Sequence, residues 1–367
     1  MKYLITEFTG LGNFIQKTPM IRSITRLDKN YEISLIGHNK WGGLDTIKNS
    51  RIINDFYVVS DKNDASETIS WIDKHNFDVI LDPPGSFTPY QIFECFLKSN
   101  AEKIIKWKEM IPLVFESPRE IICNYTLKDI FRNYYKFLKS ILKTKYISIK
   151  ENTHEIDANY DSLEKFLGKS IDRDYKTFIY FLKDPRVTAK YNLLSNKYIC
   201  VQPSAANGSP TIKTWNPENF IKLINDFESL YPEYKFVIIG DKGDNDNVIK
   251  KYVWPSNVLN LAGKTNINEL LNIMNESSCV ICHDSGVMHM SNALDIPVIA
   301  LYGPTNYQWT GPKGKNTRVI FSKNKFFNIM AKSSESEIKL GKKYRNYEAM
   351  SEIKVDLVME KIRGIIR

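Results

Sequence analysis

A strand–helix–strand pattern in the last quarter of the chain constrains the fold more than any other feature. An apolar run over Cys279–His283 ends in Asp-Ser-Gly at 284–286, a helical pattern that carries His289 follows at once, and a second apolar run ends in Gly-Pro-Thr at 303–305. Two apolar runs joined through a helix predict neighbouring parallel strands buried on both faces. Free amides at a helix start, with its positive dipole end, bind anions without a metal ion. The pattern therefore predicts a phosphate site that suits a nucleotide diphosphate.

The same alternation runs along most of the chain. It predicts a first series of strands at 2–8, 31–37, 54–60 and 77–81 with helices at 13–25 and 67–75. A second series has strands at 198–202, 235–239, 279–283 and 298–302, with helices at 217–230, 267–275 and 287–294. Alternating strands and helices are typical of an α/β protein with a parallel, doubly wound sheet. We predict two such domains, over 1–185 and 186–345, followed by a C-terminal helical segment over 346–367.

Composition narrows the class of protein. At 367 residues with 43% hydrophobic content, the chain is long enough for two globular cores. The apolar run at its start is too short for a signal peptide, and no stretch of about 18 apolar residues occurs, so a cytoplasmic protein is expected. The five cysteines are scattered, which favours reduced thiols over disulfides. Cys279, Cys282 and His283 spell a haem-attachment pattern, but we interpret the two cysteines as core residues of a buried strand.

Positive charge gathers between the two series. The net charge is +9, and Lys128–Lys150 holds seven basic residues and one acid. Over 127–143 apolar and basic residues recur on opposite faces of a helix. Such a helix could contact an anionic membrane surface or a phosphorylated acceptor, or it could pack on its own domain with a solvated lysine face. The interleaved motif typical of nucleic-acid binding is absent, so we expect no nucleic-acid partner.

Five local motifs occur in one order over nearly the whole chain. They are Thr9-Gly-Leu-Gly-Asn-Phe-Ile-Gln-Lys-Thr-Pro19, His154-Glu-Ile-Asp-Ala-Asn-Tyr160, Pro203-Ser-Ala205 leading to Lys213-Thr-Trp-Asn-Pro-Glu-Asn-Phe220, Leu261-Ala-Gly-Lys-Thr265, and the strand–helix–strand pattern described first. Each is weak alone. Together they resemble the ADP-heptose:lipopolysaccharide heptosyltransferases, glycosyltransferase family 9.

The resemblance implies the GT-B architecture of two Rossmann-like domains. The first domain would bind the acceptor and the second the nucleotide-sugar donor, and the last helix would cross back to the first domain. The family transfers a heptose with inversion, without a metal ion or cofactor, from a donor such as ADP-heptose to a lipopolysaccharide or lipo-oligosaccharide core. It works at the cytoplasmic face of the inner membrane, which would suit the basic segment over 127–143.

The strand–helix–strand pattern and the family resemblance both indicate which residues would bind the donor. Lys213, in a polar loop before a helix start, would balance the diphosphate as it leaves. Gly286 permits close approach of the backbone, Ser285 or Asp284 can cap the helix, and His289 could donate a hydrogen bond to the diphosphate. The nucleotide and phosphate contacts predicted from the sequence are Ser204, Lys213, Asp241, Asp284, Ser285, Gly286 and His289. Asp241 would hold the ribose hydroxyls, and Ser209 or Thr211 could take the place of Ser204.

Asn13 is the departure from the family pattern that matters for chemistry. Many family members carry an aspartate at this position as the general base, and an asparagine side chain cannot accept the proton. Gly10 and Gly12 still leave room for an acceptor or a sugar beside Asn13. Asp82 or Glu7 could replace the base, or either could instead cap a helix or pair with a lysine.

Other interpretations stay open on the sequence alone. The departing diphosphate could itself accept the proton. The chain could also be a catalytically silent nucleotide-sugar-binding homologue that scaffolds envelope-glycan assembly, or a sugar-nucleotide epimerase of the same architecture, although the motifs fit the transferases better.

Overall fold

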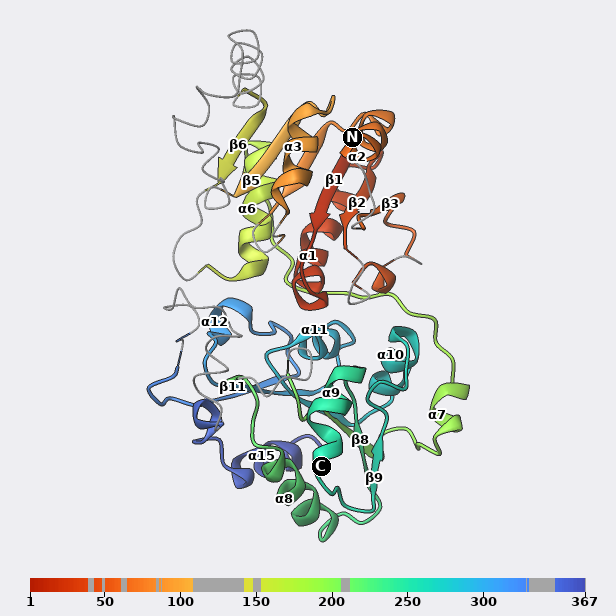
Figure 1. Ribbon diagram of the computed structural model, residues 1–367, viewed down its shortest axis with the longest axis vertical. Coiled ribbons are helices and arrows are strands. Elements are labelled where there is room, and N and C mark those ends of the chain that lie inside the picture. Colours follow the sequence, from red (N-terminus) through yellow and green to blue (C-terminus); the bar gives the residue numbers. More distant parts are fainter. Residues whose placement is uncertain are drawn as a thin grey trace, which may run out of the picture. The chain divides into compact units, whose positions relative to one another are not determined.

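The computed structural model describes residues 1–38, 43–47, 50–60, 65–83, 86, 88–107, 142–147, 153–205, 212–327, 329 and 347–366. The chain forms two compact units, Met1–Asp174 and Tyr175–Arg367 (Figure 1). The sequence places the division eleven residues later, after residue 185. Residues 170–184 have no helix or strand, so no regular element marks the boundary, and the domain limits stay a prediction.

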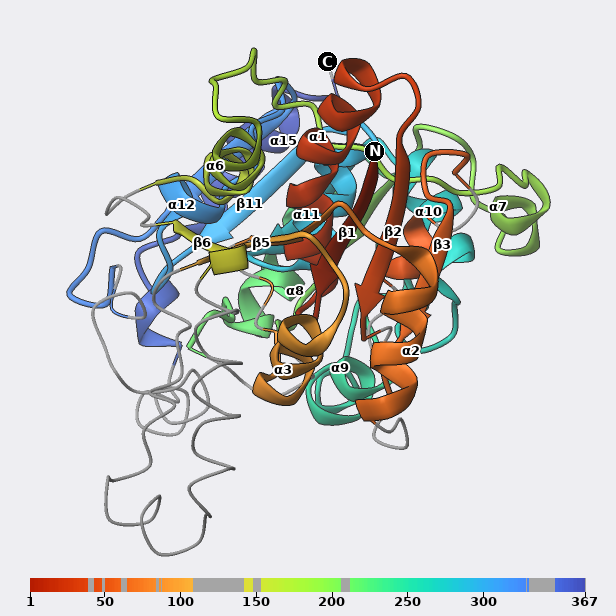
Figure 2. The same cartoon turned by 90° about the horizontal axis from the view of Figure 1, so that it is seen from above.

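The first unit is built on a six-stranded parallel sheet in the order β3-β2-β1-β4-β5-β6. Its strands are β1 (Lys2–Glu7), β2 (Glu32–Gly37), β3 (Asp55–Val58), β4 (Val79–Asp82), β5 (Lys103–Trp107) and β6 (Thr144–Ile147). Its helices include α1 (Leu11–Leu27), α2 (Ala65–His75), α3 (Tyr90–Lys98) and α6 (Glu155–Leu167). Helices α1 and α6 cover one face of the sheet and α2 and α3 the other (Figures 1 and 2).

The second unit has its own six-stranded parallel sheet in the order β12-β11-β10-β7-β8-β9. The strands are β7 (Tyr198–Val201), β8 (Lys235–Ile238), β9 (Val258–Asn260), β10 (Cys279–His283), β11 (Val298–Tyr302) and β12 (Thr317–Phe321). The helices include α7 (Arg186–Lys190), α8 (Pro217–Glu228), α9 (Lys242–Asn247), α10 (Ile267–Asn275), α11 (Gly286–Ala293), α12 (Tyr307–Thr310) and α15 (Val355–Arg363). The short helices η1, η3 and η4 cover Leu44–Thr46, Ile249–Lys251 and Glu348–Met350.

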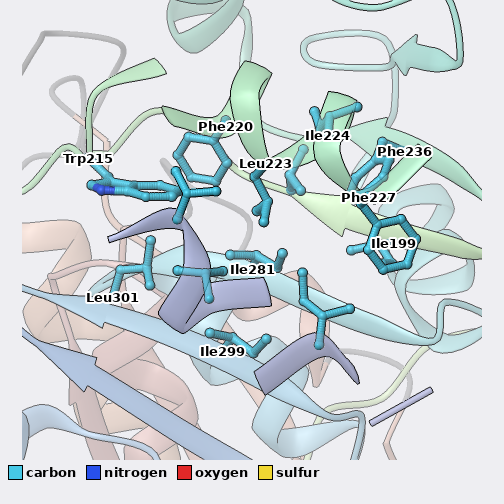
Figure 3. Close-up of a cluster of buried hydrophobic side chains, with 14 of the residues drawn as sticks. Ile199, Trp215, Phe220, Leu223, Ile224, Phe227, Phe236, Ile281, Ile299 and Leu301 are labelled. Carbon is cyan, nitrogen blue, oxygen red and sulfur yellow. The ribbon is translucent and has the colours of Figure 1, made fainter. Parts of the chain in front are cut away.

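Alternate residues of the central strands build the main core of this unit. Ile199, Ile281 and Ile299 lie in one cluster with the apolar face of α8, which includes Phe220 and Phe227 (Figure 3). Because side chains alternate along a strand, their neighbours in sequence point to the other face of the sheet. Every residue of β7, β10 and β11 is buried, as expected for strands covered on both faces.

The predicted fold class is confirmed. The strand and helix patterns at the centre of each sheet were predicted within a few residues, but β5, β6, β9 and β12 were not. Three of these strands, β6, β9 and β12, lie at sheet edges, and β5 lies next to an edge. Their short runs carry charged or polar residues among the apolar ones, so the pattern in sequence is weak without the neighbouring strand that pairs with it.

Helix α15 packs within the second unit. It contacts α8 and β11, and its residues Val358, Met359 and Ile362 belong to the core that α8 closes (Figure 1). The expected crossing of 346–367 to the first domain stays a prediction.

Candidate functional site: the carboxyl edge of the second sheet

The predicted donor site lies where β7, β10 and β11 end. These strands are adjacent and parallel, so the segments that follow them emerge along one edge of the sheet. Residues 202–204 follow β7, residues 284–286 follow β10 and residues 303–305 follow β11. The topology thus brings together three segments that are about 20 to 100 residues apart in sequence.

The turn from β10 to α11 differs from the sequence prediction. Ser285 is the N-cap residue of α11, but its side chain does not cap the helix, and neither does that of Asp284. The Ser285 hydroxyl instead donates to Gln202 Oε1 at 2.7 Å, on the neighbouring strand end. The prediction that Ser285 or Asp284 caps this helix is therefore wrong. The first turn of α11 has no side-chain cap, and its positive end faces the edge where an anion can bind.

Lys213 and Asp284 face each other at this edge. Lys213 Nζ lies 3.8 Å from Asp284 Oδ2, and the two side chains are 16% and 12% exposed. The other oxygen of Asp284 accepts hydrogen bonds from Tyr302 at 3.4 Å and from Thr310 at 3.3 Å. Burial and the nearby Asp284 carboxylate raise the pKa of Tyr302 well above its usual value, so its hydroxyl stays a donor. The carboxylate thus places a cation beside the start of α11.

Two further predicted residues lie on elements that meet at this edge of the sheet. His289, on α11, is 4% exposed, and Ser204, after β7, is fully buried. Within the described part of the chain, the Ser204 hydroxyl has no hydrogen-bond partner. Buried hydroxyls nearly always have one, so Ser204 is a candidate for a ligand contact. Ser209 and Thr211 lie outside the described residues.

His283 is a residue of this site that the sequence did not reveal as such. It is the last residue of β10, and its Nε2 accepts a hydrogen bond from the Trp215 amide at 2.9 Å. Burial lowers the pKa of His283 to about 4, against the opposing effects of the Ser204 backbone and the Asp284 charge. A histidine inside an otherwise apolar strand needs a buried partner, and that requirement was the signal available in the sequence.

The two cysteines of the apparent haem-attachment pattern are core residues. Cys279 and Cys282 are completely buried, and only Cys279 belongs to the cluster under α8, as expected for strand residues three apart. Burial raises the pKa of both thiols. The described cysteines have free thiols, and Cys123 lies outside the described residues.

Asp241, the predicted ribose contact, caps α9. Its side chain accepts from the Asp244 amide at 2.7 Å, and Asp244 Oδ2 accepts from the Asp241 amide at 3.0 Å. This reciprocal capping box fixes the loop after β8. One carboxylate oxygen of Asp241 is therefore engaged, and the ribose contact stays a prediction. In the described part of the chain, no group of three or more His, Cys, Asp or Glu side chains is arranged to hold a metal ion.

In the first unit, a short segment over 8–10, called the glycine loop below, joins β1 to α1. Gly10 is the N-cap residue, Asn13 lies in the first helical turn, and a Cβ added at Gly10 would meet no atom within 4 Å. The loop is fixed from below by Glu7, whose Oε1 accepts from the Thr9 amide at 2.8 Å. The space expected beside this loop is thus present at Gly10.

Both candidate replacement bases pair with a lysine. Glu7 pairs with the buried Lys17. Asp82 is 3% exposed and pairs with Lys106, while its Oδ1 accepts from Thr6 at 2.7 Å and from Thr88 at 2.6 Å. Asp82 thus accepts three hydrogen bonds, so most of the acceptor sites of its carboxylate are occupied.

The architecture identifies the fold. Two doubly wound, six-stranded parallel sheets with a polar carboxyl edge are the GT-B fold of glycosyltransferases. Residues 129–338 match Glycosyltransferase family 9 (heptosyltransferase). The chain belongs to this family.

Solved structures agree on the fold. The family 9 glycosyl transferase from Veillonella parvula superposes with a TM-score of 0.73 at 19% identity, covering 100% of this chain and 97% of that one. E. coli ADP-heptose LPS heptosyltransferase II gives 0.70 at 15% identity, covering 100% and 98%. E. coli heptosyltransferase WaaC with ADP gives 0.66 at 14% identity, covering 99% of each chain. At these identities the likeness establishes the fold.

Similar sequences carry related names. Lipooligosaccharide heptosyltransferase 2 of Haemophilus influenzae is 31% identical over 109 residues, which cover 29% of each chain. Lipopolysaccharide heptosyltransferase 2 of Salmonella typhimurium is 39% identical over 61 residues, 17% of this chain and 18% of that protein. The match thus spans less than a third of these two relatives. Lipooligosaccharide heptosyltransferase 2 of Campylobacter jejuni is 24% identical over 319 residues, covering 83% of this chain and 94% of the relative.

The predicted membrane contact falls mainly outside the described residues. Residues 127–141 of the basic segment are not among them. None of the described helices combines the length and apolar character needed to cross a bilayer.

Proposed function

We propose that this chain transfers a heptose, or a related sugar, from a nucleotide diphosphate sugar to a lipopolysaccharide or lipo-oligosaccharide core, with inversion and without a metal ion. ADP-heptose is the proposed donor. The observation that carries the proposal is the meeting of Lys213, Asp284 and the uncapped start of α11 at one sheet edge. Family membership supports it, as does the solved structure of a relative, E. coli WaaC, with ADP.

The donor site would act on the leaving group. As the bond to the sugar breaks, negative charge develops on the diphosphate, and cations and amide donors placed there lower the barrier. Lys213 supplies the cation and the first turn of α11 supplies the amides. Ser204, Ser285, Gly286 and His289 are proposed as further contacts, and Asp241 as a contact to the ribose. The proposed acceptor loop is formed by Gly10, Gly12 and Asn13 in the first unit.

The fate of the acceptor proton is the open chemical step. Asn13 cannot take it. Asp82 is the proposed side-chain base, but its engagement with Lys106, Thr6 and Thr88 favours the second route, in which the departing diphosphate oxygen takes the proton. In that route the enzyme relies on positioning and on leaving-group stabilisation.

Turnover with defined donors tests the proposal. The purified chain is mixed with ADP-heptose, GDP-heptose or common sugar nucleotides and a truncated lipo-oligosaccharide, and nucleotide release is measured with and without EDTA. We expect acceptor-dependent release that is greatest with ADP-heptose and is unchanged by EDTA. Lys213→Met should reduce release at least 10²-fold, whereas the control Lys222→Met, at a 62% exposed lysine on α8, should not. No release with any donor would overturn the proposal.

A catalytically silent binding homologue is the second candidate. It is favoured by Asn13 and by the buried, paired state of Asp82. It predicts nucleotide binding that depends on Lys213, no turnover with any acceptor, and no change in binding on Asp82→Ala. Calorimetry with ADP beside the release assay separates the two candidates.

A further inference from the structure

The placement of Lys213 depends on a loop without regular structure. Residues 212–216 form no helix or strand and lead into α8, and Lys213 lies near their start. A flexible lysine contributes to a charged site only if its backbone is held in place. The question is which contacts hold the loop at the sheet edge.

Trp215 anchors this loop through two hydrogen bonds. Its amide donates to His283 Nε2 at 2.9 Å, and its indole N–H donates to the Ile353 carbonyl at 2.9 Å. The Trp215 side chain is fully buried and packs edge-on against Phe220, which in turn packs edge-on against His283. Figure 3 shows Trp215 and Phe220 in the core next to β10 and β11. The anchor is thus part of the core, two residues from Lys213.

Two consecutive residues at the end of strand β10 hold the loop, the last strand residue His283 and the next residue, Asp284. His283 accepts from the amide of residue 215, and Asp284 faces the ammonium of Lys213 at 3.8 Å. One contact fixes the backbone and the other attracts the charge. A side chain without an acceptor at 283 would leave the Trp215 amide buried without its partner, which is unfavourable and frees the loop to move.

We propose that His283 is a positioning residue, which holds the Lys213 ammonium at the donor diphosphate through its hydrogen bond from the Trp215 amide. The inference rests on the proposed function of the donor site. It requires an uncharged acceptor at residue 283, because a protonated imidazole carries a hydrogen on Nε2 and cannot accept from the Trp215 amide. It also predicts that glutamine, whose Oε1 can occupy the place of Nε2, replaces His283 better than leucine of similar size.

A double-mutant cycle tests this role. The affinity of the full chain is measured by calorimetry for ADP, GDP and UDP, and the tightest of these is used with His283→Leu, His283→Gln, Lys213→Met and the His283→Leu/Lys213→Met pair. Circular dichroism checks that each variant is folded at the temperature used. We expect His283→Leu to weaken binding about tenfold, and His283→Gln to stay within about threefold of the unsubstituted chain.

The cycle separates positioning from general structural damage. If His283 acts through Lys213, His283→Leu should weaken binding by less than about twofold once Lys213 is already methionine. Equal losses in both backgrounds, or unchanged binding by His283→Leu, would overturn the inference alone. Absence of binding by the unsubstituted chain to all three nucleotides would overturn the proposed function and the inference with it. A His283→Leu variant that does not fold leaves the glutamine variant as the test, and a loss above about tenfold there also overturns the inference.

Discussion

Lys17 and Glu7 form an ion pair that is closed to solvent beneath the glycine loop of the first unit. Their side chains are 0% and 2% exposed. Lys17 also donates to the Thr6 carbonyl at 3.1 Å and to Ser86 Oγ at 3.0 Å, and Glu7 fixes the Thr9 amide. The pair therefore joins β1, α1 and the segment after β4 into one polar network.

Removal of one partner from this pair should be costly. Lys17→Met leaves the Glu7 carboxylate buried without its cation, so we expect the free energy of unfolding to fall by about 3–5 kcal/mol. Glu7→Gln added to Lys17→Met should recover part of the loss, because it removes the unpaired charge. Urea unfolding measures both. Lys29→Met, at an exposed lysine, is the control and should change stability by less than about 0.5 kcal/mol. A small effect of Lys17→Met would contradict a closed ion pair.

The role of Asp82, as a base or as the partner of Lys106, can be decided by measuring both kcat and the free energy of unfolding of a variant. If it serves the network with Lys106, Asp82→Asn should lower the free energy of unfolding by about 3 kcal/mol, because Lys106 loses its partner, yet change kcat by less than about fivefold. If Asp82 is the base, kcat should fall by about 10²–10⁴. We expect the first outcome. Urea unfolding and nucleotide release at saturating donor, on the same preparations, decide between the two.

Asn13 offers the reverse experiment. Asn13→Asp places a carboxylate in the first turn of α1, at the position where the family pattern has its base. We expect kcat to rise at least tenfold. The variant should lose this gain as the pH falls below about 4, because only the ionised carboxylate accepts a proton. A pH–rate profile of both proteins measures the gain, and an unchanged profile would mean that residue 13 does not approach the acceptor.

Gly10, which precedes α1, and Gly37, at the end of β2, differ in the space that an alanine side chain would find. A Cβ at Gly37 would come 1.7 Å from the Glu7 carbonyl oxygen, whereas one at Gly10 would meet nothing within 4 Å. Gly37→Ala should therefore destabilise or unfold the first unit, and Gly10→Ala should leave the free energy of unfolding within about 0.5 kcal/mol. If a substrate uses the open space, Gly10→Ala should raise KM for the acceptor or the donor. Unchanged kinetics in a folded Gly10→Ala protein would argue against an acceptor or sugar contact at this position.

His283 gives the second unit a defined pH dependence. Its pKa is lowered by burial from 6.5 to about 4 in the folded chain. In the unfolded chain His283 becomes protonated as the pH falls through about 6.5. In the folded chain it becomes protonated only as the pH falls through about 4. The contribution is thus fully present above pH 6.5 and is lost progressively below it, by about 3 kcal/mol at pH 4.

Comparison with His283→Gln isolates this contribution. Urea unfolding of both proteins at pH 7, 5 and 4 should show that the unsubstituted chain loses more stability than the variant as the pH falls. The difference between the two should be constant above about pH 6.5. Parallel losses across the whole range would mean that His283 is accessible to protons in the folded state.

Parts of the candidate site could be predicted where a single short segment has a recognisable sequence pattern. The turn at 284–286 follows from a buried strand that ends in Asp-Ser-Gly before a helix, and Lys213 follows from its place in a motif shared with a family. By contrast, Ser285 donates to Gln202, which is 83 residues away in sequence, so local capping rules gave the wrong partner. Pairing of Asp82 with a lysine was one of the expected alternatives, but the identity of that lysine, Lys106, was hidden because β5 was not predicted.

The sequence by itself determined the two parallel sheets, the order of their central elements and the edge at which an anion could bind, because hydrophobic periodicity and turn residues act over short distances. The tertiary structure decided the partners of the polar groups. Which acids pair with Lys17 and Lys106, where the Ser285 hydroxyl donates, and which histidine holds the Lys213 loop all depend on strands that meet only after folding. Buried polar groups are satisfied by whatever the fold brings within about 3 Å, and that distance is not encoded in spacing along the chain.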